Sequence, residues 1–160
     1  MIEREPRLPL GTSMGGQGAL RLSYKFPDKF PIAAAISPAI DYQLRYNEGD
    51  ETIPQMYPDP EAVRQDTATL HIHPLNWPRH QFFCCDPEDY RWWESANRLR
   101  MKLYSLGVPH VCDLETTGGG HGFDYYNKWP RGRLNSSWSG WGRNEGELSR
   151  RKDPASPGRR

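Results

Sequence analysis

Short apolar runs alternate with helical patterns over the first 114 residues, and this alternation restricts the possible folds more than any other feature of the sequence. Four runs are expected to form strands: 7–10, 32–36, 81–85 and 108–114. Two segments are expected to form helices, 15–26 and 91–106, which end at Pro27 and Gly107. Continuous apolar strands between helices are typical of parallel sheets. The sequence therefore predicts an α/β fold with a parallel sheet and flanking helices.

A long irregular stretch, residues 38–80, separates the second and third predicted strands. It contains several prolines, tyrosines and acidic residues, with one short helix expected at Pro60–Gln65. Connections of this length are uncommon in compact domains and usually carry a binding surface. We therefore expect residues 38–80, termed the insertion below, to form a cap beside the functional site.

Charge is divided unevenly along the chain. The formal net charge is +1, but residues 128–160 hold nine of the 21 basic and three of the 20 acidic side chains. This part has neither helical nor strand periodicity, so a disordered basic tail is expected after residue 127. No RNA-binding motif, zinc-finger spacing or basic helical stripe accompanies it, and nucleic-acid binding is therefore not expected.

Neither a membrane span nor a secretory signal is recognisable in the sequence. No run of about 18 apolar residues occurs, and the start, MIEREPRLPL, lacks a basic region followed by an apolar core. The three cysteines form an odd set that does not suit a disulfide framework. We therefore expect no membrane partner and a reducing, cytoplasmic location.

Residues 11–16, GTSMGG, place the pattern G-x-S-x-G between a predicted strand and a predicted helix. In this context a sharp turn strains the backbone of the serine, and the glycines at both ends of the pattern let neighbouring backbone come close. Ser13 is thus a candidate nucleophile, and the backbone N–H of Met14 is a candidate oxyanion donor. A glycine-rich helix start with Ser13 as its N-cap is the alternative.

A nucleophilic serine needs a histidine base that is oriented by a carboxylate, and candidates for both follow in the order Asp, His. His121 lies in GGGHG, where glycines would leave its ring mobile and accessible; a surface histidine beside a flexible turn is the alternative. Asp89 is the candidate acid, because a few residues after the third strand are needed to reach the histidine. Asp86 remains the alternative acid. Three aromatic residues are expected to anchor the histidine loop: Phe123, Tyr125 and Tyr126.

Two segments, GTSMGGQGALRLSYKFPDKF and TGGGHGFDYYN, resemble the α/β-hydrolase superfamily and, within it, the Putative esterase family. This family includes proteins similar to esterase D, S-formylglutathione hydrolases and feruloyl esterases. The resemblance covers residues 8–127 and implies a serine carboxylic-ester hydrolase with the triad Ser13, Asp89 and His121, which needs no cofactor.

Family members have roughly as much chain again before the serine, including the first strands and a loop that donates the second oxyanion N–H. Residues 1–127 are therefore expected to be the C-terminal part of an α/β-hydrolase domain that lacks the N-terminal strands. Three alternatives stay open. The same triad could act as an acyltransferase, the chain could be an inactive truncated fragment, or it could complete itself by pairing with another chain through an exposed sheet edge.

Two further groups of side chains suggest sites. Tyr42 and Tyr46 follow the second predicted strand and are candidate substrate-binding residues, with simple packing as the alternative. Six residues could in principle bind zinc: His71, His73, His80, Cys84, Cys85 and Cys112. Adjacent Cys84 and Cys85 in a strand point to opposite faces and cannot readily share one ion, so no metal site is expected.

Overall fold

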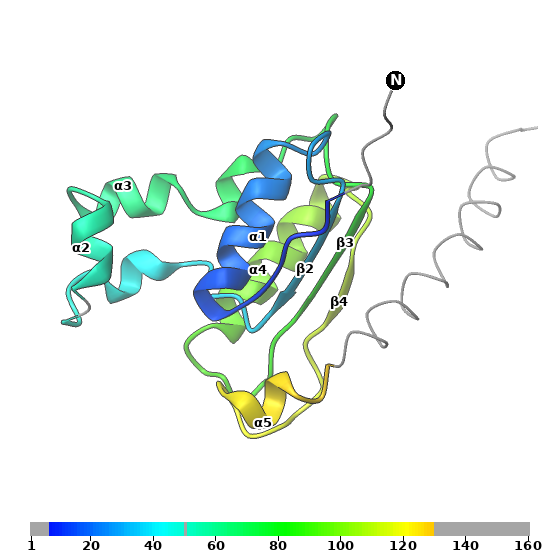
Figure 1. Cartoon of the computed structure of the whole chain (residues 1–160). Helices are drawn as coiled ribbons and strands as arrows, with labels where there is room; N and C mark the ends of the chain where they lie inside the picture. The colour runs from blue at the N-terminus through cyan, green and yellow to red at the C-terminus, as the bar shows by residue number, and fades with distance from the viewer. Residues whose placement is uncertain (1–6, 50, 130–160) are drawn as a thin grey trace, which may run out of the picture. The chain divides into compact units, whose positions relative to one another are not determined.

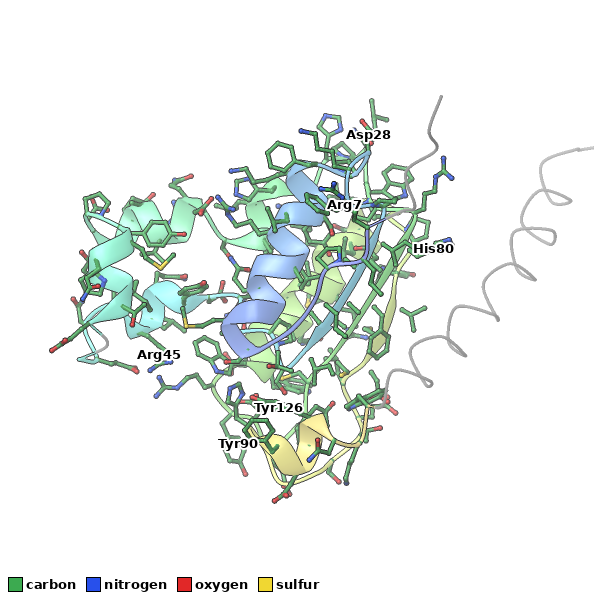
Figure 2. All side chains as sticks on the ribbon, viewed as in Figure 1. Arg7, Asp28, Arg45, His80, Tyr90 and Tyr126 are labelled. Atoms are coloured by element: carbon green, nitrogen blue, oxygen red, sulfur yellow. The ribbon has the colours of Figure 1, made fainter. Side chains whose placement is uncertain are left out.

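Within residues 7–49 and 51–129, the part that this computed structural model describes, four parallel strands form one sheet in the order β1-β2-β3-β4. The strands are β1 (Leu10–Thr12), β2 (Ile32–Ile36), β3 (His80–Cys84) and β4 (Val111–Asp113) (Figure 1). Because all strands are parallel, their carboxyl ends meet at one edge of the sheet, near Tyr90 and Tyr126, whereas Arg7 and His80 mark the opposite edge (Figure 2). The predicted parallel α/β fold is confirmed.

The strand boundaries agree with the prediction at β2 and differ elsewhere. β1 was predicted at 7–10, but its pairing with β2 begins at Leu10 and continues through Thr12. Pro9 has no N–H to donate and contributes only its carbonyl, which accepts a hydrogen bond from Ala34 at 3.0 Å. β3 begins and ends one residue earlier than predicted, and β4 is shorter than the predicted 108–114. The serine therefore follows β1 directly.

Two 13-residue helices, α1 (Ser13–Lys25) and α4 (Trp93–Ser105), lie on the same face of the sheet (Figure 1). Alternate residues of the strands, such as Ala35 and Phe83, turn toward this face and join a core with the fully buried Leu20 and Leu99. Burying each such leucine stabilises the fold by about 1.5–3 kcal/mol. Gly107, just after α4, has φ +67°, the left-handed conformation expected of a residue that ends a helix.

The opposite face of the sheet receives Phe82, whose ring centroid lies 5.3 Å from that of Trp129. Trp129 follows the short helix α5 (Phe123–Tyr126), which the sequence did not predict. Lys128 and Trp129 donate backbone hydrogen bonds to residues of α5. The remainder of the predicted tail, 130–160, lies outside the described residues.

Apart from residue 50, which the structure does not describe, the insertion contains four short helices: η1 (Tyr42–Arg45), α2 (Thr52–Met56), α3 (Pro60–Gln65) and η2 (Ala68–His71). Only α3 was predicted. Its local signals are strong, because Pro60 opens the helix and the Asp59 side chain accepts a hydrogen bond from the N–H of Ala62 at 2.8 Å. None of the helices in the described part of the chain is both long and apolar enough to cross a membrane.

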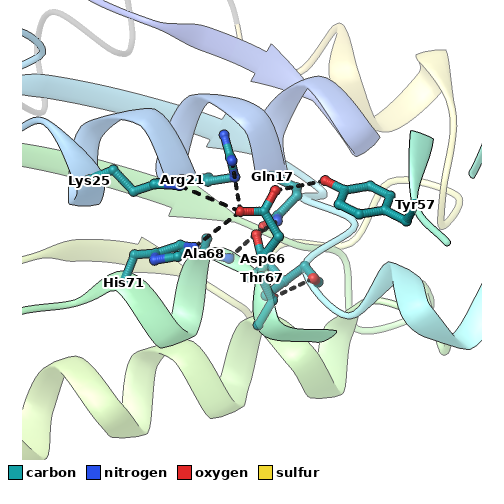
Figure 3. A network of polar contacts seen from close by, with 9 residues as sticks. Gln17, Arg21, Lys25, Tyr57, Asp66, Thr67, Ala68 and His71 are labelled. Atoms are coloured by element: carbon teal, nitrogen blue, oxygen red, sulfur yellow. Dashed lines mark hydrogen bonds and ion pairs between the residues drawn. The ribbon is translucent and has the colours of Figure 1, made fainter. Parts of the chain in front are cut away.

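A polar network around Asp66 fixes the insertion to α1 (Figure 3). The Asp66 carboxylate accepts hydrogen bonds from Arg21 and from the Tyr57 hydroxyl, each at 2.7 Å, and the Lys25 amine lies 3.7 Å away. Burial raises the pKa of Asp66, but these cationic and hydrogen-bonding partners outweigh burial and hold the pKa below its usual range. The network therefore joins the insertion to the helix that begins at Ser13.

Gln17, one turn after Ser13 on α1, makes the most buried link to the insertion. Its side-chain oxygen accepts a hydrogen bond from the N–H of Ala68 at 3.1 Å, and its nitrogen donates to the carbonyl of Asp66 at 3.3 Å. A buried amide with both ends paired is strongly position-specific, because leaving either end unpaired is costly. Gln17 thus fixes the register between α1 and the start of η2.

Candidate active site

Ser13 occupies a strained turn between β1 and α1. Its φ is +51°, in the left-handed region that residues with a Cβ rarely adopt. Gly11 permits this turn, because a Cβ at Gly11 would lie 2.2 Å from the backbone carbonyl of Gly15. A Cβ at Gly16 would lie 3.1 Å from the carbonyl oxygen of Gly11, whereas the space around a Cβ at Gly15 is open. The close approach therefore depends on Gly11 and Gly16, and not on Gly15 as the sequence pattern suggested.

The structure brings Ser13, His121 and Asp89 together although they are far apart in sequence. His121 Nε2 lies 3.0 Å from Ser13 Oγ, and His121 Nδ1 lies 2.7 Å from Asp89 Oδ2. When the carboxylate is ionised and the ring is neutral, this geometry requires the proton on Nδ1 and leaves Nε2 to accept from the serine hydroxyl. The Asp89 side chain is 2% exposed and that of His121 is 33% exposed. A buried carboxylate thus contacts a ring that solvent can reach.

Asp86, the alternative acid, has a different environment. It is fully buried, and its Oδ2 accepts hydrogen bonds from the N–H groups of Gly118 at 2.6 Å and Gly120 at 2.9 Å. Its Oδ1 accepts a third hydrogen bond from the N–H of Glu88 at 2.8 Å. Both oxygens are therefore engaged with backbone, and Asp86 ties the end of β3 to the loop that carries His121.

The glycines before His121 serve this attachment. Gly119 and Gly120 have φ values of +95° and +76°, which turn the amides of the loop toward Asp86. The glycines were expected to leave the His121 ring mobile, but hydrogen bonds to Asp86 hold the loop in place. The ring is still partly exposed, as expected. Tyr126 contacts the His121 ring edge-on at 5.7 Å between centroids, and Trp92 lies on another side at 6.5 Å.

The N–H of Met14 lies in the first turn of α1, where backbone amides have no acceptor within the helix. Positive potential at a helix N-terminus favours negative charge at this point. The Met14 side chain packs against the core between the sheet and its helices, and also against a small cluster in the insertion. Met14 therefore has its backbone N–H in the first turn of α1, next to Ser13, and its side chain packed between the core and the insertion.

A cavity of about 350 Å³ adjoins His121 at the carboxyl edge of the sheet. The residues that line it are Arg45, Glu48, Asp89, Arg91, Trp92 and His121. A larger cavity of about 810 Å³ lies at the opposite edge of the sheet, beside residues such as Asp28 and His80, and contains none of the candidate catalytic side chains (Figure 2). Of these two cavities, only the smaller one is lined by His121 and Asp89.

Tyr42 and Tyr46, the predicted substrate-binding residues, do not line this cavity. Tyr42 is 8% exposed and packs with Ile53 and Val63 in the cluster that the Met14 side chain joins. The Tyr46 hydroxyl donates a hydrogen bond to the carbonyl of Tyr57 at 3.2 Å. Both residues thus pack within the insertion, at η1 and at its C-cap, and their role in substrate binding stays a prediction.

The sequence analysis did not identify the charged residues of the cavity. Arg45 lies in η1, within the insertion that was expected to form a cap. Arg91 lies two residues after Asp89, the candidate acid. Arg91 forms an ion pair with Glu48, and its guanidinium carbon lies 5.9 Å from the centre of the Trp92 ring. The sequence signal that could have identified Arg91 is its position beside an aromatic residue, Trp92, just after the loop that carries Asp89.

The cysteines are separated as the strand pattern predicts. Cys85 belongs to the core under α1 and α4, and its Sγ lies 3.6 Å from Asp89 Oδ2, whereas Cys84 does not belong to that core. Burial raises the pKa of both thiols well above the usual range, so they stay protonated at neutral pH. In the described part of the chain no three potential ligands gather into a metal-binding group.

The family model described as Putative esterase matches residues 2–129 of this chain. The chain belongs to this family. No curated protein matches the sequence of this esterase-family member.

Solved structures similar to this esterase-family chain include enzymes of ester chemistry. The capsule O-acetyltransferase of Neisseria meningitidis serogroup A has 17% identity and a TM-score of 0.62, over 79% of this chain and 53% of that one. The fluorophosphonate-binding serine hydrolase F of Staphylococcus aureus has 18% identity and a TM-score of 0.57, over 76% and 49%. A ferulic acid esterase has 18% identity and a TM-score of 0.55, over 74% and 45%. The chain thus spans about half the length of these structures and shares their fold.

Proposed function

We propose that this member of the esterase family hydrolyses carboxylic esters through a catalytic triad of Ser13, His121 and Asp89. The observation that carries the proposal is the continuous path from Ser13 Oγ through the His121 ring to a buried carboxylate, with contacts of 3.0 and 2.7 Å. The strained φ of Ser13 and its place at the start of α1 support the same role. A surface histidine or an N-capping serine would need none of these contacts.

The first half of the reaction forms an acyl-enzyme. Ser13 Oγ attacks the carbonyl carbon of the ester while His121 Nε2 takes the hydroxyl proton, and the carbonyl electrons move to oxygen. Asp89 holds the ring in the correct tautomer and stabilises the imidazolium ion. When the tetrahedral species collapses, the bond to the leaving alcohol breaks, and His121 returns the proton to that alcohol.

The second half of the reaction releases the acid. A water molecule attacks the acyl carbon of the Ser13 ester, His121 takes one of its protons, and the proton then passes to Ser13 Oγ as the carboxylic acid leaves. The N–H of Met14 is the proposed donor to the oxyanion in both halves. A second donor is expected from outside the described residues, because one lost donor costs on the order of 10²–10³ in rate. The triad itself needs no cofactor.

Labelling with a neutral fluorophosphonate tests the proposal. The full chain is expected to form a stable adduct at Ser13, located by peptide mass spectrometry, and to hydrolyse p-nitrophenyl esters of short acids. Ser13→Ala should abolish both signals. Ser105→Ala, at an exposed serine at the end of α4, is the matched control and should retain them. A soluble, folded chain that gives neither adduct nor hydrolysis would refute the proposal and favour an inactive or partner-dependent fragment.

Acyl transfer to an alcohol is the second candidate. It is favoured by the exposed side of the His121 ring, which an alcohol can reach as readily as water, and by the shared fold with an O-acetyltransferase. The two functions differ only in the acceptor. With p-nitrophenyl acetate and added glycerol, an acyltransferase gives p-nitrophenol in excess over free acetate, whereas a hydrolase gives equal amounts.

A further inference from the structure

The buried carboxylate of Asp89 has fewer donors than that of Asp86, which accepts from three backbone N–H groups. Among the described residues, the contacts of Asp89 Oδ2 are His121 Nδ1 at 2.7 Å and the thiol of Cys85 at 3.6 Å. Sulfur is larger than oxygen, so 3.6 Å lies within the hydrogen-bonding range of a thiol. Because the Asp89 side chain is only 2% exposed, water cannot readily replace a lost donor. Its orientation therefore depends on both side chains.

The Cys85 thiol is the donor in this contact. An ionised carboxylate has no proton to give. Burial raises the pKa of Cys85 well above the usual range, and the adjacent charge of Asp89 raises it further, so the thiol keeps its proton. The Ser37 side chain acts on this pKa in the opposite direction, as a hydrogen-bond donor to sulfur does, but the raising effects are larger. The thiol proton is therefore left for Asp89.

Cys85 is a fixed point for this contact, because it directly follows β3. Its backbone N–H donates to the carbonyl of Asp113 in β4 at 3.0 Å, and its side chain is fully buried in the core under α1 and α4. Asp89 instead lies in the turn after the strand, where its N–H donates to the carbonyl of Asp86 at 2.9 Å. The thiol thus connects the carboxylate of this turn to the sheet.

We propose that Cys85 is a positioning residue of the triad, whose S–H donates to Asp89 Oδ2 and holds the carboxylate in the orientation that His121 needs. The inference rests on the proposed esterase function and adds a residue to it. Cys85 is fully buried and does not touch the ester, so its effect is transmitted through Asp89. Without the thiol, the carboxylate can rotate away from Nδ1, and the ring is held less often in the orientation that accepts the Ser13 proton.

Cys84 offers a matched control, because it is the same type of residue, is equally buried and lies one position earlier. Adjacent residues of a strand point to opposite faces, and Cys84 does not belong to the core that contains Cys85. Burial raises the pKa of Cys84, and the side chain that acts on this pKa next is Tyr125, not Asp89. Cys84→Ala and Cys85→Ala therefore remove the same atoms from the interior, but only the second removes a donor from Asp89.

Hydrolysis of p-nitrophenyl acetate by the full chain compares the two variants. Cys85→Ala should lower kcat by about twofold to tenfold, as for one lost hydrogen bond, and leave KM nearly unchanged. Cys84→Ala should keep the wild-type kcat, although both variants should unfold at a lower urea concentration. A wild-type kcat in Cys85→Ala, or an equal fall of kcat in both variants, would overturn the inference.

Infrared spectroscopy of the S–H stretch tests the contact itself and requires no activity. The bands of Cys84 and Cys112 are assigned from their alanine variants, and the remaining band belongs to Cys85, so Cys85→Ala need not fold. A hydrogen bond lowers the stretching frequency of its donor. Asp89→Asn, whose amide is a weaker acceptor than a carboxylate, should therefore move the Cys85 band to higher frequency and leave the Cys84 band in place. An unchanged Cys85 band would overturn the inference.

The outcomes separate this inference from the function on which it rests. If the wild-type chain hydrolyses esters and Cys85→Ala does so with the same kcat, the positioning role is overturned and the esterase proposal stands. If no ester is hydrolysed and Ser13 is not labelled by the fluorophosphonate, both proposals fail, whatever the infrared bands show.

Discussion

Asp86 and Asp89 lie three residues apart after β3, yet their carboxylates face different partners. Asp89 Oδ2 meets the His121 ring, whereas Asp86 accepts hydrogen bonds from three backbone amides. The sequence could place both after the strand, but only the turn formed by residues 86–89 decides which carboxylate reaches the histidine. The two residues are therefore expected to fail in different ways when they are changed.

Asparagine substitutions separate the two roles. Asp89→Asn keeps the size of the side chain but no longer favours the tautomer with the proton on Nδ1, so kcat should fall by a factor on the order of 10⁴ with a smaller effect on stability. Asp86→Asn presents an NH₂ group to backbone donors and should lower the free energy of unfolding by about 1–3 kcal/mol. Urea denaturation and ester hydrolysis measure the two quantities. If Asp86→Asn instead lowered kcat and Asp89→Asn lowered stability, Asp86 would be the residue that orients His121.

At the scale of the element, the strand–turn–helix around Ser13 depends on one glycine more than on another. Gly11→Ala would place a Cβ 2.2 Å from the Gly15 backbone, so the turn must open, at a cost of about 3 kcal/mol or more. Gly15→Ala has open space and should change stability by less than about 1 kcal/mol, in the stabilising direction. Thermal unfolding and the fluorophosphonate labelling rate compare the two variants. Equal losses of stability in the two variants would contradict the close approach of Gly11 to the Gly15 backbone.

The attachment of the insertion to α1 should weaken on acidification. Burial lowers the pKa of His71, and the nearby charge of Lys25 lowers it further, so the folded state holds the neutral ring. The stability that this gives is present above the unfolded pKa of about 6.5 and is lost as the pH falls below it. Asp66, with its lowered pKa, adds a second loss as the pH falls below about 4.

Hydrogen exchange at the Ala68 amide, which is bonded to Gln17, reports this attachment. Its protection factor, corrected for the intrinsic rate, should fall between pH 7.5 and 5.5. His71→Gln should remove that fall and leave the loss near pH 4 in place. A protection factor that stays constant from pH 7.5 to 5.5 in the wild-type chain would exclude His71 as the cause.

Elements with complete local signals were predictable from the sequence, and elements that depend on distant partners were not. β2 is a continuous apolar run that ends at Ser37 and Pro38, and α3 has both a capping residue and an initial proline. In contrast, the start of η2 is held by a hydrogen bond to Gln17 of α1, 51 positions earlier, so the residues around η2 carry no signal that predicts it. The same distinction holds at the site. Ser13 and His121 lie in glycine motifs, whereas Arg45 reaches the cavity only through the folded insertion.

At the scale of the whole molecule, the edge of β1 is open within the described residues. β1 pairs with β2 on one side only, and Leu8 and Leu10 are 42% and 40% exposed. Unpaired edges of this kind favour association with another strand. We therefore propose self-association of this chain through β1, with a second copy as the partner.

Light scattering over a range of concentrations tests this association. The wild-type chain is expected to form dimers, and Leu10→Lys should shift it toward the monomer by placing a charge on the edge. Leu75→Lys is the control, because Leu75 is 84% exposed and belongs to no strand. A monomeric wild-type chain at all concentrations would contradict the proposal, as would an equal shift with both variants.

The separation of 108 positions between Ser13 and His121 has a consequence for the order of folding. During translation the serine emerges from the ribosome well before the histidine, so β1, α1 and β2 can form while the base is still being synthesised. Such a nascent domain would hold Ser13 in its turn without a proton acceptor. Because the closing contact has a high sequence separation, it is expected to form late. Reactivity of Ser13 toward a fluorophosphonate would therefore report that the loop carrying His121 has reached its place.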